Sequence, residues 1–363
     1  MPGRIVVFGA TGFTGRLVVA ALVARGARPV LAGRGRAALE ELAAASGGLD
    51  VATADAAQPG TVRALVGRGD ALVTTVGPFT RYGAPALDAA LDAGAHYVDS
   101  TGEASFVRAV WAAGPRAEAA GSALLTAFGF DFVPGNLAGA LALRDAGAAA
   151  RGLEIGYFVT GGGISSGTRA SGLLIAGERV HARRGARLVE LPLARETRTF
   201  EVAGRSLSGV LFGGTEPLAL PRLAPGLTDV TTYLGGLGAP TQVLRAVSYA
   251  LPVLLAAPGG RAMLSAAADR AMRRTGSGPG EGRRGRARST VVAVASDAAG
   301  APLSTVALDG PDPYDLTGAL LADAAVRLAG GEIDRTGALG PVDAYGVDGL
   351  EAACAAAGLR RAG

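Results

Sequence analysis

Lysine is missing from this chain, because all 35 residues counted as Lys or Arg are arginines. A Schiff-base mechanism needs a lysine amine, and so does a lysine general base, so both are excluded. Every positive side chain is instead a planar guanidinium, which suits bidentate recognition of carboxylates and phosphates.

Cysteine and histidine are nearly as scarce. The 363 residues include one cysteine, Cys354, and two histidines, His96 and His181. An internal disulfide is therefore impossible, a reducing cytoplasm is the expected location, and a Cys/His metal cluster is excluded, so we expect no metal site. His96 lies in an apolar segment and is predicted to be a core residue. His181, among arginines, is predicted to lie on a surface helix or loop.

Long hydrophobic runs and strong charge bias are also lacking. The most apolar late segment, Val243–Leu264, is interrupted by Arg245, Pro252, Pro258 and two glycines, and it falls short of the ~20 apolar residues that a membrane span needs. The first strand begins by Arg4, which argues against a signal peptide. The densest basic run, Arg283–Arg288, has no interleaved aromatics, so it favours a solvated loop over a nucleic-acid surface.

A glycine-rich turn stands close to the N-terminus. An apolar strand at residues 4–8 leads into Gly9-Ala-Thr-Gly12-Phe-Thr-Gly15, and a helical pattern follows. Glycines in such a turn let the chain leave the strand sharply, let a pyrophosphate approach bare backbone, and let the helix pack close to the sheet. The helix N-terminus adds N–H groups and a positive dipole end. A purely structural tight turn is the alternative reading.

The second strand ends without an acid. Nineteen residues after Gly15 (34 − 15 = 19) stands Arg34, where an Asp or Glu would bind the ribose 2′-OH of NAD. An arginine at this place accommodates the 2′-phosphate of NADP, so the chain is predicted to bind NADP(H). Arg36 is a second candidate for the same phosphate, and a simple surface arginine is the alternative.

Short apolar runs alternate with helical patterns through the first third of the chain, which predicts a doubly wound parallel Rossmann sheet of the α/β class. Ligands bind beyond the carboxyl ends of such strands. The polar loops there predict further site residues. Asp55 is placed near an adenine or at a helix cap. Gly77, Pro78 and Phe79 are placed near a nicotinamide, with Phe79 or Tyr82 as the stacking ring and Tyr82 also as a possible proton donor. Gly102 and Glu103 are placed at the mouth of the crevice or at a helix start.

A second domain of mixed α+β structure is expected after residue 130. The predicted division is a Rossmann domain at 1–130, a substrate or dimerisation domain at 131–310, and C-terminal helices at 311–363 that return to the first domain. A second glycine-rich loop, Gly161–Thr168, either cradles an anion or substrate carbonyl or caps a helix.

Taken together, these motifs resemble the saccharopine dehydrogenase-like family of NAD(P)-binding reductases, and most of all its trans-acting enoyl reductase branch. The resemblance rests on a set of segments in the order that the fold requires: Gly9–Gly15, Ala32–Arg34, Gly77–Gly83, His96–Glu103 and Gly129–Pro134. It implies NADPH held by Gly9, Thr11, Gly12, Phe13, Thr14, Gly15 and Arg34. Lysine-forming members are thought to use a lysine, which this chain lacks.

The resemblance implies an NADPH-dependent oxidoreductase that reduces the C=C bond of an acyl thioester, either a free small molecule or carrier-bound. Tyr82, Ser166 and Asp131 are the candidate catalytic residues, as proton donors or as donors to the substrate carbonyl. Two alternatives stay open: an imine or ketone reductase on the same scaffold, and a non-catalytic NADPH-binding protein. No nucleic-acid partner is expected, and a homodimer is left open.

Overall fold

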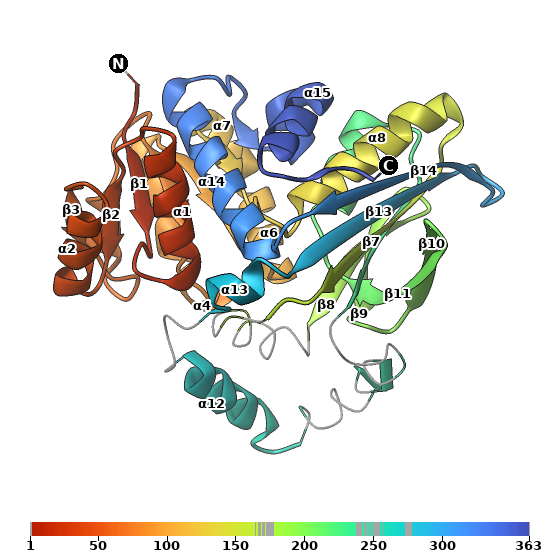
Figure 1. The fold of residues 1–363 in the computed structure, drawn as a ribbon, viewed down its shortest axis with the longest axis horizontal. Coiled ribbons are helices and arrows are strands. Elements are labelled where there is room, and N and C mark those ends of the chain that lie inside the picture. The colour runs from red at the N-terminus through yellow and green to blue at the C-terminus, as the bar shows by residue number, and fades with distance from the viewer. Residues whose placement is uncertain are drawn as a thin grey trace. The chain divides into compact units, whose positions relative to one another are not determined.

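The structure is a computed structural model of the chain (Figure 1), and it describes residues 2–163, 178–236, 257–272 and 278–362, with residues 165, 168, 171, 242, 245–246, 248–249 and 255. The described chain forms two compact units. The first contains Met1–Asp131, Thr275–Gly278 and Tyr314–Leu339, and the second contains Phe132–Arg274, Pro279–Pro313 and Gly340–Gly363. In the described residues no helix combines the length and the apolar character that crossing a membrane requires.

The first unit is built on a parallel sheet of seven described strands in the order β15-β6-β5-β4-β1-β2-β3. Chain order reverses between β1 and β4, which is where such sheets bind their ligands. The strands are β1 (Ile5–Phe8), β2 (Val30–Gly33), β3 (Val51–Thr53), β4 (Ala71–Thr74), β5 (His96–Asp99), β6 (Ala123–Leu125) and β15 (Gly337–Ala338).

Helices fill the connections between these strands. They are α1 (Phe13–Ala24), α2 (Arg36–Ala45), α3 (Pro59–Arg63), α4 (Phe79–Tyr82), α5 (Ala84–Ala93), α6 (Ala104–Ala112), α7 (Gly114–Ala120) and, from the C-terminal part, α14 (Pro313–Gly330). One face of the sheet forms a core with α3, α5, α6 and α7, centred on side chains such as Phe8, Leu72 and Leu124. The predicted Rossmann sheet is therefore confirmed.

Helix α14 returns to this unit and lies beside α1, although the two are far apart in sequence (Figure 1). A Cβ at Gly318 would lie 2.9 Å from Cβ of Leu17, so the helices approach closely there. The Arg25 guanidinium donates to the Ala319 carbonyl at 3.3 Å. This confirms the expected return of the C-terminal part to the first sheet.

The second unit contains a mixed sheet in the order β10-β11-β12-β7-β13-β14-β16, with β8 pairing with β12 and β9. This confirms the expected mixed domain. Its strands are β7 (Gly152–Thr160), β8 (Arg179–Arg184), β9 (Arg187–Pro192), β10 (Thr197–Val202), β11 (Arg205–Phe212), β12 (Asp229–Gly235), β13 (Arg288–Ser296), β14 (Pro302–Gly310) and β16 (Arg360–Arg361). Its helices are α8 (Val133–Ala146), a 3-10 turn (Gly147–Ala149), α10 (Glu216–Leu223), α12 (Gly260–Met272), α13 (Glu281–Arg284) and α15 (Pro341–Ala356).

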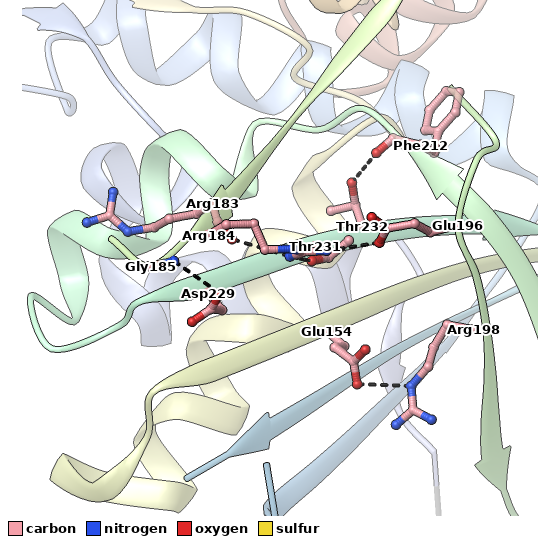
Figure 2. Close-up of polar contacts among 10 residues, drawn as sticks. All are labelled: Glu154, Arg183, Arg184, Gly185, Glu196, Arg198, Phe212, Asp229, Thr231 and Thr232. Atoms are coloured by element: carbon pink, nitrogen blue, oxygen red, sulfur yellow. Dashed lines mark hydrogen bonds and ion pairs between the residues drawn. The ribbon is translucent and has the colours of Figure 1, made fainter. Parts of the chain in front are cut away.

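Two arginine–carboxylate pairs lie in the second unit, between segments that are not paired with each other in the sheet (Figure 2). Arg184 lies 3.0 Å from Glu196, and Arg198 lies 2.9 Å from Glu154. Because these side chains are partly exposed, each pair contributes only about 0–1 kcal/mol. The pairs therefore add little to the stability of this unit.

The expected C-terminal segment 311–363 is shared between the units, since α15 and β16 group with the second one. The domain boundaries expected at residues 130 and 310 stay a prediction, because the division of the chain into two compact units does not test whether each part folds on its own. His181 is a correction: it lies on β8 and is only 5% exposed, whereas a surface helix or loop was expected. Its two neighbours on β8, Val180 and Ala182, are buried as well, so this part of the strand is covered on both faces.

Asp70 fixes the edge of the first sheet opposite the ligand-binding edge. Its carboxylate accepts hydrogen bonds from the backbone N–H groups of Arg4 and Gly67, at 2.8 and 2.9 Å, and from the Arg4 guanidinium. Burial pushes the pKa of Asp70 up, but the hydrogen bonds outweigh it, so the pKa lies below its ordinary value of 3.8.

We expect Asp70→Ala to lower the free energy of unfolding by about 1–3 kcal/mol at pH 7, because two backbone donors lose their acceptor. Since the folded pKa is lowered, this contribution is present above pH 3.8 and fades as the pH falls through the folded value. Urea denaturation at several pH values measures it. Asp88→Ala, which breaks an exposed pair with Arg116, is the control and should change stability by less than about 1 kcal/mol. An equal loss in both variants would contradict this account.

Candidate functional site

Two of the three glycines in the first loop are required by the fold itself. Gly9 has φ +92°, and a Cβ there would lie 2.7 Å from Thr75 Oγ1. A Cβ at Gly15 would lie only 2.1 Å from the Gly9 carbonyl oxygen. These glycines therefore let α1 start directly beneath the end of β1, as the sequence predicted.

Gly12 differs from its neighbours in the motif. A Cβ at this position would meet a single atom of the chain, the Gly9 carbonyl oxygen at 3.2 Å, so packing makes little demand for glycine. Gly12 is the N-cap of α1, and no side chain there caps the helix. The first-turn N–H groups lack acceptors within the helix, which leaves a site that fits a pyrophosphate.

Thr11, Phe13 and Thr14 complete the loop. The Thr11 carbonyl accepts a hydrogen bond from Arg16 Nε at 3.1 Å, and Thr14 is half-buried in the first turn. The Phe13 ring packs edge-on against Tyr314 at 5.1 Å between centroids. A Cβ at Gly278 would lie 2.3 Å from the same ring. Phe13 is thus anchored by residues that local sequence patterns did not reveal.

Arg34 and Arg36 are distinguished by the structure. Arg36 Nε donates to Glu40 at 2.8 Å within α2, so its guanidinium already has a carboxylate partner. Arg34 follows β2 directly, is exposed, and makes no ion pair or side-chain hydrogen bond with any residue that the structure describes. Among the two candidates, Arg34 is therefore the one available to a phosphate.

Asp55 follows β3 and forms a local turn. Its Oδ1 accepts a hydrogen bond from the Ala57 N–H at 3.0 Å, and its own N–H donates to Thr61 Oγ1 at 2.9 Å. Asp55 therefore stabilises the turn before α3 and does not cap the helix, whose N-cap is Gln58. A contact of Asp55 with an adenine stays a prediction.

Glu103 clamps the turn after β4. It is 0% exposed, and its two oxygens accept the N–H groups of Phe79 and Thr80, both at 2.8 Å, together with the Thr80 hydroxyl at 2.7 Å. The carboxylate therefore fixes the turn that contains Gly77 and Pro78. Gly77 itself has only ordinary contacts at its Cβ position, of 3.5 Å or more, so bare backbone faces outward there.

The side chain of Phe79 does not serve as a stacking surface. It is 6% exposed, belongs to the core of the first unit, and packs against Phe106 with 5.6 Å between ring centroids. The expectation that Phe79 stacks on a nicotinamide is therefore wrong. Its apolar ring is buried in the core of the first unit, where it is more stable than on an exposed surface. Tyr82, at the end of α4, is half-buried and has Arg81 5.9 Å from its ring.

Asp131 lies against Gly102. A Cβ at Gly102 would be 3.0 Å from Asp131 Oδ2, so this glycine makes room for the carboxyl group. Asp131 is half-buried, and no described residue donates a side-chain or backbone hydrogen bond to its carboxyl. Burial raises the pKa of Asp131 to about 6. Such a group can hold and release a proton near neutral pH.

Asp99, at the end of β5, is a structural acid that the sequence analysis did not single out. It accepts hydrogen bonds from the Thr101 and Ala127 N–H groups, at 2.9 and 2.8 Å, and from Thr126 Oγ1 at 2.9 Å. Burial raises the pKa of Asp99 to about 6, although these bonds oppose the shift. An acid ending a buried strand is the signal that could have revealed it.

Two further expectations have mixed outcomes. His96 Nδ1 accepts the Ala123 N–H at 3.1 Å, and burial lowers the pKa of His96, which confirms its structural role. Ser166 lies outside the described residues. Its neighbour Ser165 accepts the Thr168 N–H at 3.1 Å, which favours capping for this loop. Within the described part of the chain, no group of three His, Cys, Asp or Glu side chains could hold a metal ion.

The parallel sheet, the uncapped first turn of α1 and Arg34, which has no ion pair with any described residue, are the features of a dinucleotide-binding fold of the Rossmann class. Comparison with known proteins agrees, because residues 5–125 match the model of the saccharopine dehydrogenase NADP binding domain. The whole chain also has the fold of saccharopine dehydrogenase: it superimposes on the L-Glu-forming enzyme from Saccharomyces cerevisiae with TM-score 0.60, 13% identity and 96% coverage of both chains.

Curated relatives match over a shorter stretch. A trans-acting enoyl reductase from Mycobacterium leprae is 41% identical over 140 residues, which cover 37% of this chain and 34% of that protein. One from Mycobacterium ulcerans is 39% identical over 141 residues, with the same coverage. The matched stretch thus spans about a third of these relatives.

We expect Arg34→Ser to weaken NADPH binding about tenfold and to leave NADH binding unchanged, because only the 2′-phosphate loses a charge-assisted hydrogen bond. Arg36→Ser is the matched control, since Arg36 is already paired with Glu40. Calorimetric titration of both variants with both nucleotides measures the difference. Equal losses in the two variants, or an equal loss for NADH, would contradict the assignment.

Gly12→Ala should weaken binding of NADPH and NADH alike, by about tenfold or more, because the added methyl occupies the approach to the bare first turn. The melting temperature should change little, since the methyl meets only one protein atom. Gly15→Ala, whose methyl would collide with the Gly9 carbonyl, should instead destabilise the fold. If Gly12→Ala binds nucleotides normally, the pyrophosphate does not lie there.

Proposed function

We propose that this protein is an NADPH-dependent reductase that delivers hydride to a C=C bond conjugated with the carbonyl of an acyl thioester, free or carrier-bound. The observation that carries the proposal is the exposed, unpaired Arg34 at the end of β2, beside a glycine-rich helix start. The mycobacterial relatives named as trans-acting enoyl reductases support the choice of reaction.

The residues that would hold NADPH are those of the first loop together with Arg34, namely Gly9, Thr11, Gly12, Phe13, Thr14 and Gly15. When bound, the nicotinamide supplies the hydride. The Gly77–Pro78 turn, held rigid by Glu103, supports the region where the ring is expected. This chain must then orient the substrate, exclude water and protonate the reduced carbon.

Asp131 is the proton donor that we favour. Its carboxyl lies beyond the end of β5, next to Gly102, at the edge of the sheet where ligands bind. Because the pKa of Asp131 is raised to about 6, part of the population carries a proton at neutral pH. Tyr82 is the second candidate, since its phenol is half-buried beside the Glu103-clamped turn.

The activity test is incubation with NADPH and a short enoyl thioester, followed by the loss of NADPH absorbance. We expect saturable turnover with the enoyl substrate and little with NADH. Reduction of imines or ketones but not of enoyl thioesters would replace the proposed reaction by its alternative. Tight NADPH binding without oxidation across all three substrate classes would indicate a non-catalytic nucleotide-binding protein.

Asp131→Asn should lower kcat about a hundredfold, because the proton donor is lost while NADPH binding is retained. In the wild type, kcat should fall as the pH rises through about 6, since the donor must be protonated. The variant should lose this pH dependence. Stopped-flow rates across pH measure both effects, with Tyr82→Phe as the comparison. Unchanged kcat in Asp131→Asn and a large loss in Tyr82→Phe would transfer the role to Tyr82.

A further inference from the structure

The carboxylate of Asp99 is buried between two loops of the first unit, and the proposed reaction does not use it. Asp99 ends β5 and is 0% exposed. Its Oδ1 accepts the N–H groups of Thr101 and Ala127, at 2.9 and 2.8 Å, and its Oδ2 accepts the Thr126 hydroxyl at 2.9 Å. Its backbone carbonyl accepts the Phe128 N–H at 2.8 Å. One residue therefore joins the loop after β5 to the loop after β6.

The backbone of the loop after β6 needs this support. Ala127 has φ +55°, in the left-handed region where a residue with a Cβ is strained. Such a conformation persists only where the surrounding structure fixes it. Ala127 is 0% exposed, so no water can replace Asp99 as the acceptor of its N–H group. The shape of this loop therefore depends on the Asp99 carboxylate.

The same loop ends at Asp131, the proposed proton donor. Gly129 makes room for Thr317 of α14, since a Cβ there would lie 2.6 Å from Thr317 Cγ2. The Phe130 N–H donates to Thr317 Oγ1 at 2.9 Å, and the Gly129 N–H donates to the Asp131 carbonyl at 3.4 Å. No described residue donates a hydrogen bond to the Asp131 carboxyl itself. The direction of that carboxyl thus depends on how the backbone of the loop is held.

The loop after β5 provides the surface against which the Asp131 carboxyl rests. A Cβ at Gly102 would lie 3.0 Å from Asp131 Oδ2. Gly102 follows Thr101, whose N–H is bonded to Asp99 and whose hydroxyl accepts the Glu103 N–H at 3.1 Å. Asp99 thus holds both the backbone that carries Asp131 and the backbone that the Asp131 carboxyl touches. All of these residues belong to the first unit.

We propose that Asp99 is a positioning residue, whose carboxylate fixes the loops after β5 and β6 relative to each other and thereby sets the direction of the Asp131 carboxyl. This inference rests on the proposed function, since it assumes Asp131 as the proton donor. Asp99 itself need not touch substrate or cofactor. Small displacements of a catalytic group lower rates strongly, so anchoring of this kind affects kcat more than nucleotide binding.

Asp99→Ala and Asp99→Asn together test the proposal. Asp99→Ala leaves the N–H groups of Thr101 and Ala127 without their acceptor, so we expect kcat to fall about tenfold or more, while KM for NADPH stays within about twofold. Asp99→Asn keeps Oδ1 for both N–H groups, and its amide can donate to the Thr126 hydroxyl. It should therefore retain kcat within about threefold. If Asp99→Asn lost as much activity as Asp99→Ala, Asp99 would be a proton donor and the inference would be overturned.

Asp70→Ala is the matched control for loss of stability. Asp70 also accepts two backbone N–H groups with a buried carboxylate, but at the opposite edge of the same sheet. Its variant should therefore be destabilised to a similar degree and keep the kcat of the wild type, at a temperature where circular dichroism shows all variants folded. Equal kcat in Asp70→Ala and Asp99→Ala would overturn the inference. If Asp99→Ala does not fold, Thr126→Val, which removes one bond to Asp99 and keeps the side-chain shape, should lower kcat about threefold. Wild-type kcat in that variant would count against the proposal.

The double variant Asp99→Ala/Asp131→Asn tests whether Asp99 acts through Asp131. In that case the double variant should be no slower than Asp131→Asn alone. Losses that multiply would overturn the inference.

A readout independent of turnover covers the case in which no enoyl substrate is reduced. Carbon-13 NMR titration can follow the Asp131 carboxyl, assigned by the resonance lost in Asp131→Asn. Asp99→Ala should shift the apparent pKa of Asp131 from about 6 towards the ordinary aspartate range, since the released carboxyl meets water. Asp99→Asn removes the same charge but keeps the acceptor, so it should leave the pKa of Asp131 near that of the wild type. Identical titrations in wild type and Asp99→Ala would overturn the inference even if the proposed reaction proves correct.

Discussion

The approach of Gly15 to the carbonyl oxygen of Gly9 is the constraint on which the first unit depends. Only two hydrogen atoms at Gly15 Cα leave space for that oxygen, since a Cβ would lie 2.1 Å away. The contact forces α1 to begin immediately beyond β1, so its first turn lies at the carboxyl end of β1, beside its paired neighbour β4. A helix N-terminus without a side-chain cap carries a partial positive charge. Where the strand order reverses, such an end favours the binding of an anion. Arg34, at the neighbouring strand end, is the residue that we propose distinguishes NADPH from NADH.

Local sequence was sufficient to predict this half of the molecule. Strands and helices alternate with short connections, and each apolar run is bounded by glycine or a polar residue. The glycine spacing in the loop Gly9–Gly15 is typical of one kind of strand-to-helix turn. The same locality explains why Arg34 was found: its place is fixed by the end of β2. Which of Arg34 and Arg36 is available could not be read from sequence, because that depends on the i,i+4 pairing of Arg36 with Glu40 within α2.

Contacts between distant segments escaped the sequence analysis. Phe13 packs against Tyr314, and Glu103 caps the Phe79–Thr80 turn from another loop, so neither role has a local signal. Phe79 was misread for the same reason, since its burial against Phe106 is a tertiary effect. In the second unit β8 and β12 pair although they are far apart in the sequence, and His181 is buried on β8, which no local pattern indicated. The acid–phenol pair of Glu216 and Tyr157 joins a helix start to a strand 59 residues away.

The central claim is that a guanidinium at the second strand end reads the phosphate on the adenosine ribose. Isothermal titration of the unmodified protein with the two reduced nicotinamide nucleotides tests it most directly. The account predicts at least about tenfold tighter binding of NADPH than of NADH at low salt, with the difference shrinking as salt screens the exposed arginine. Equal affinities for the two nucleotides, or a preference for NADH, would contradict it.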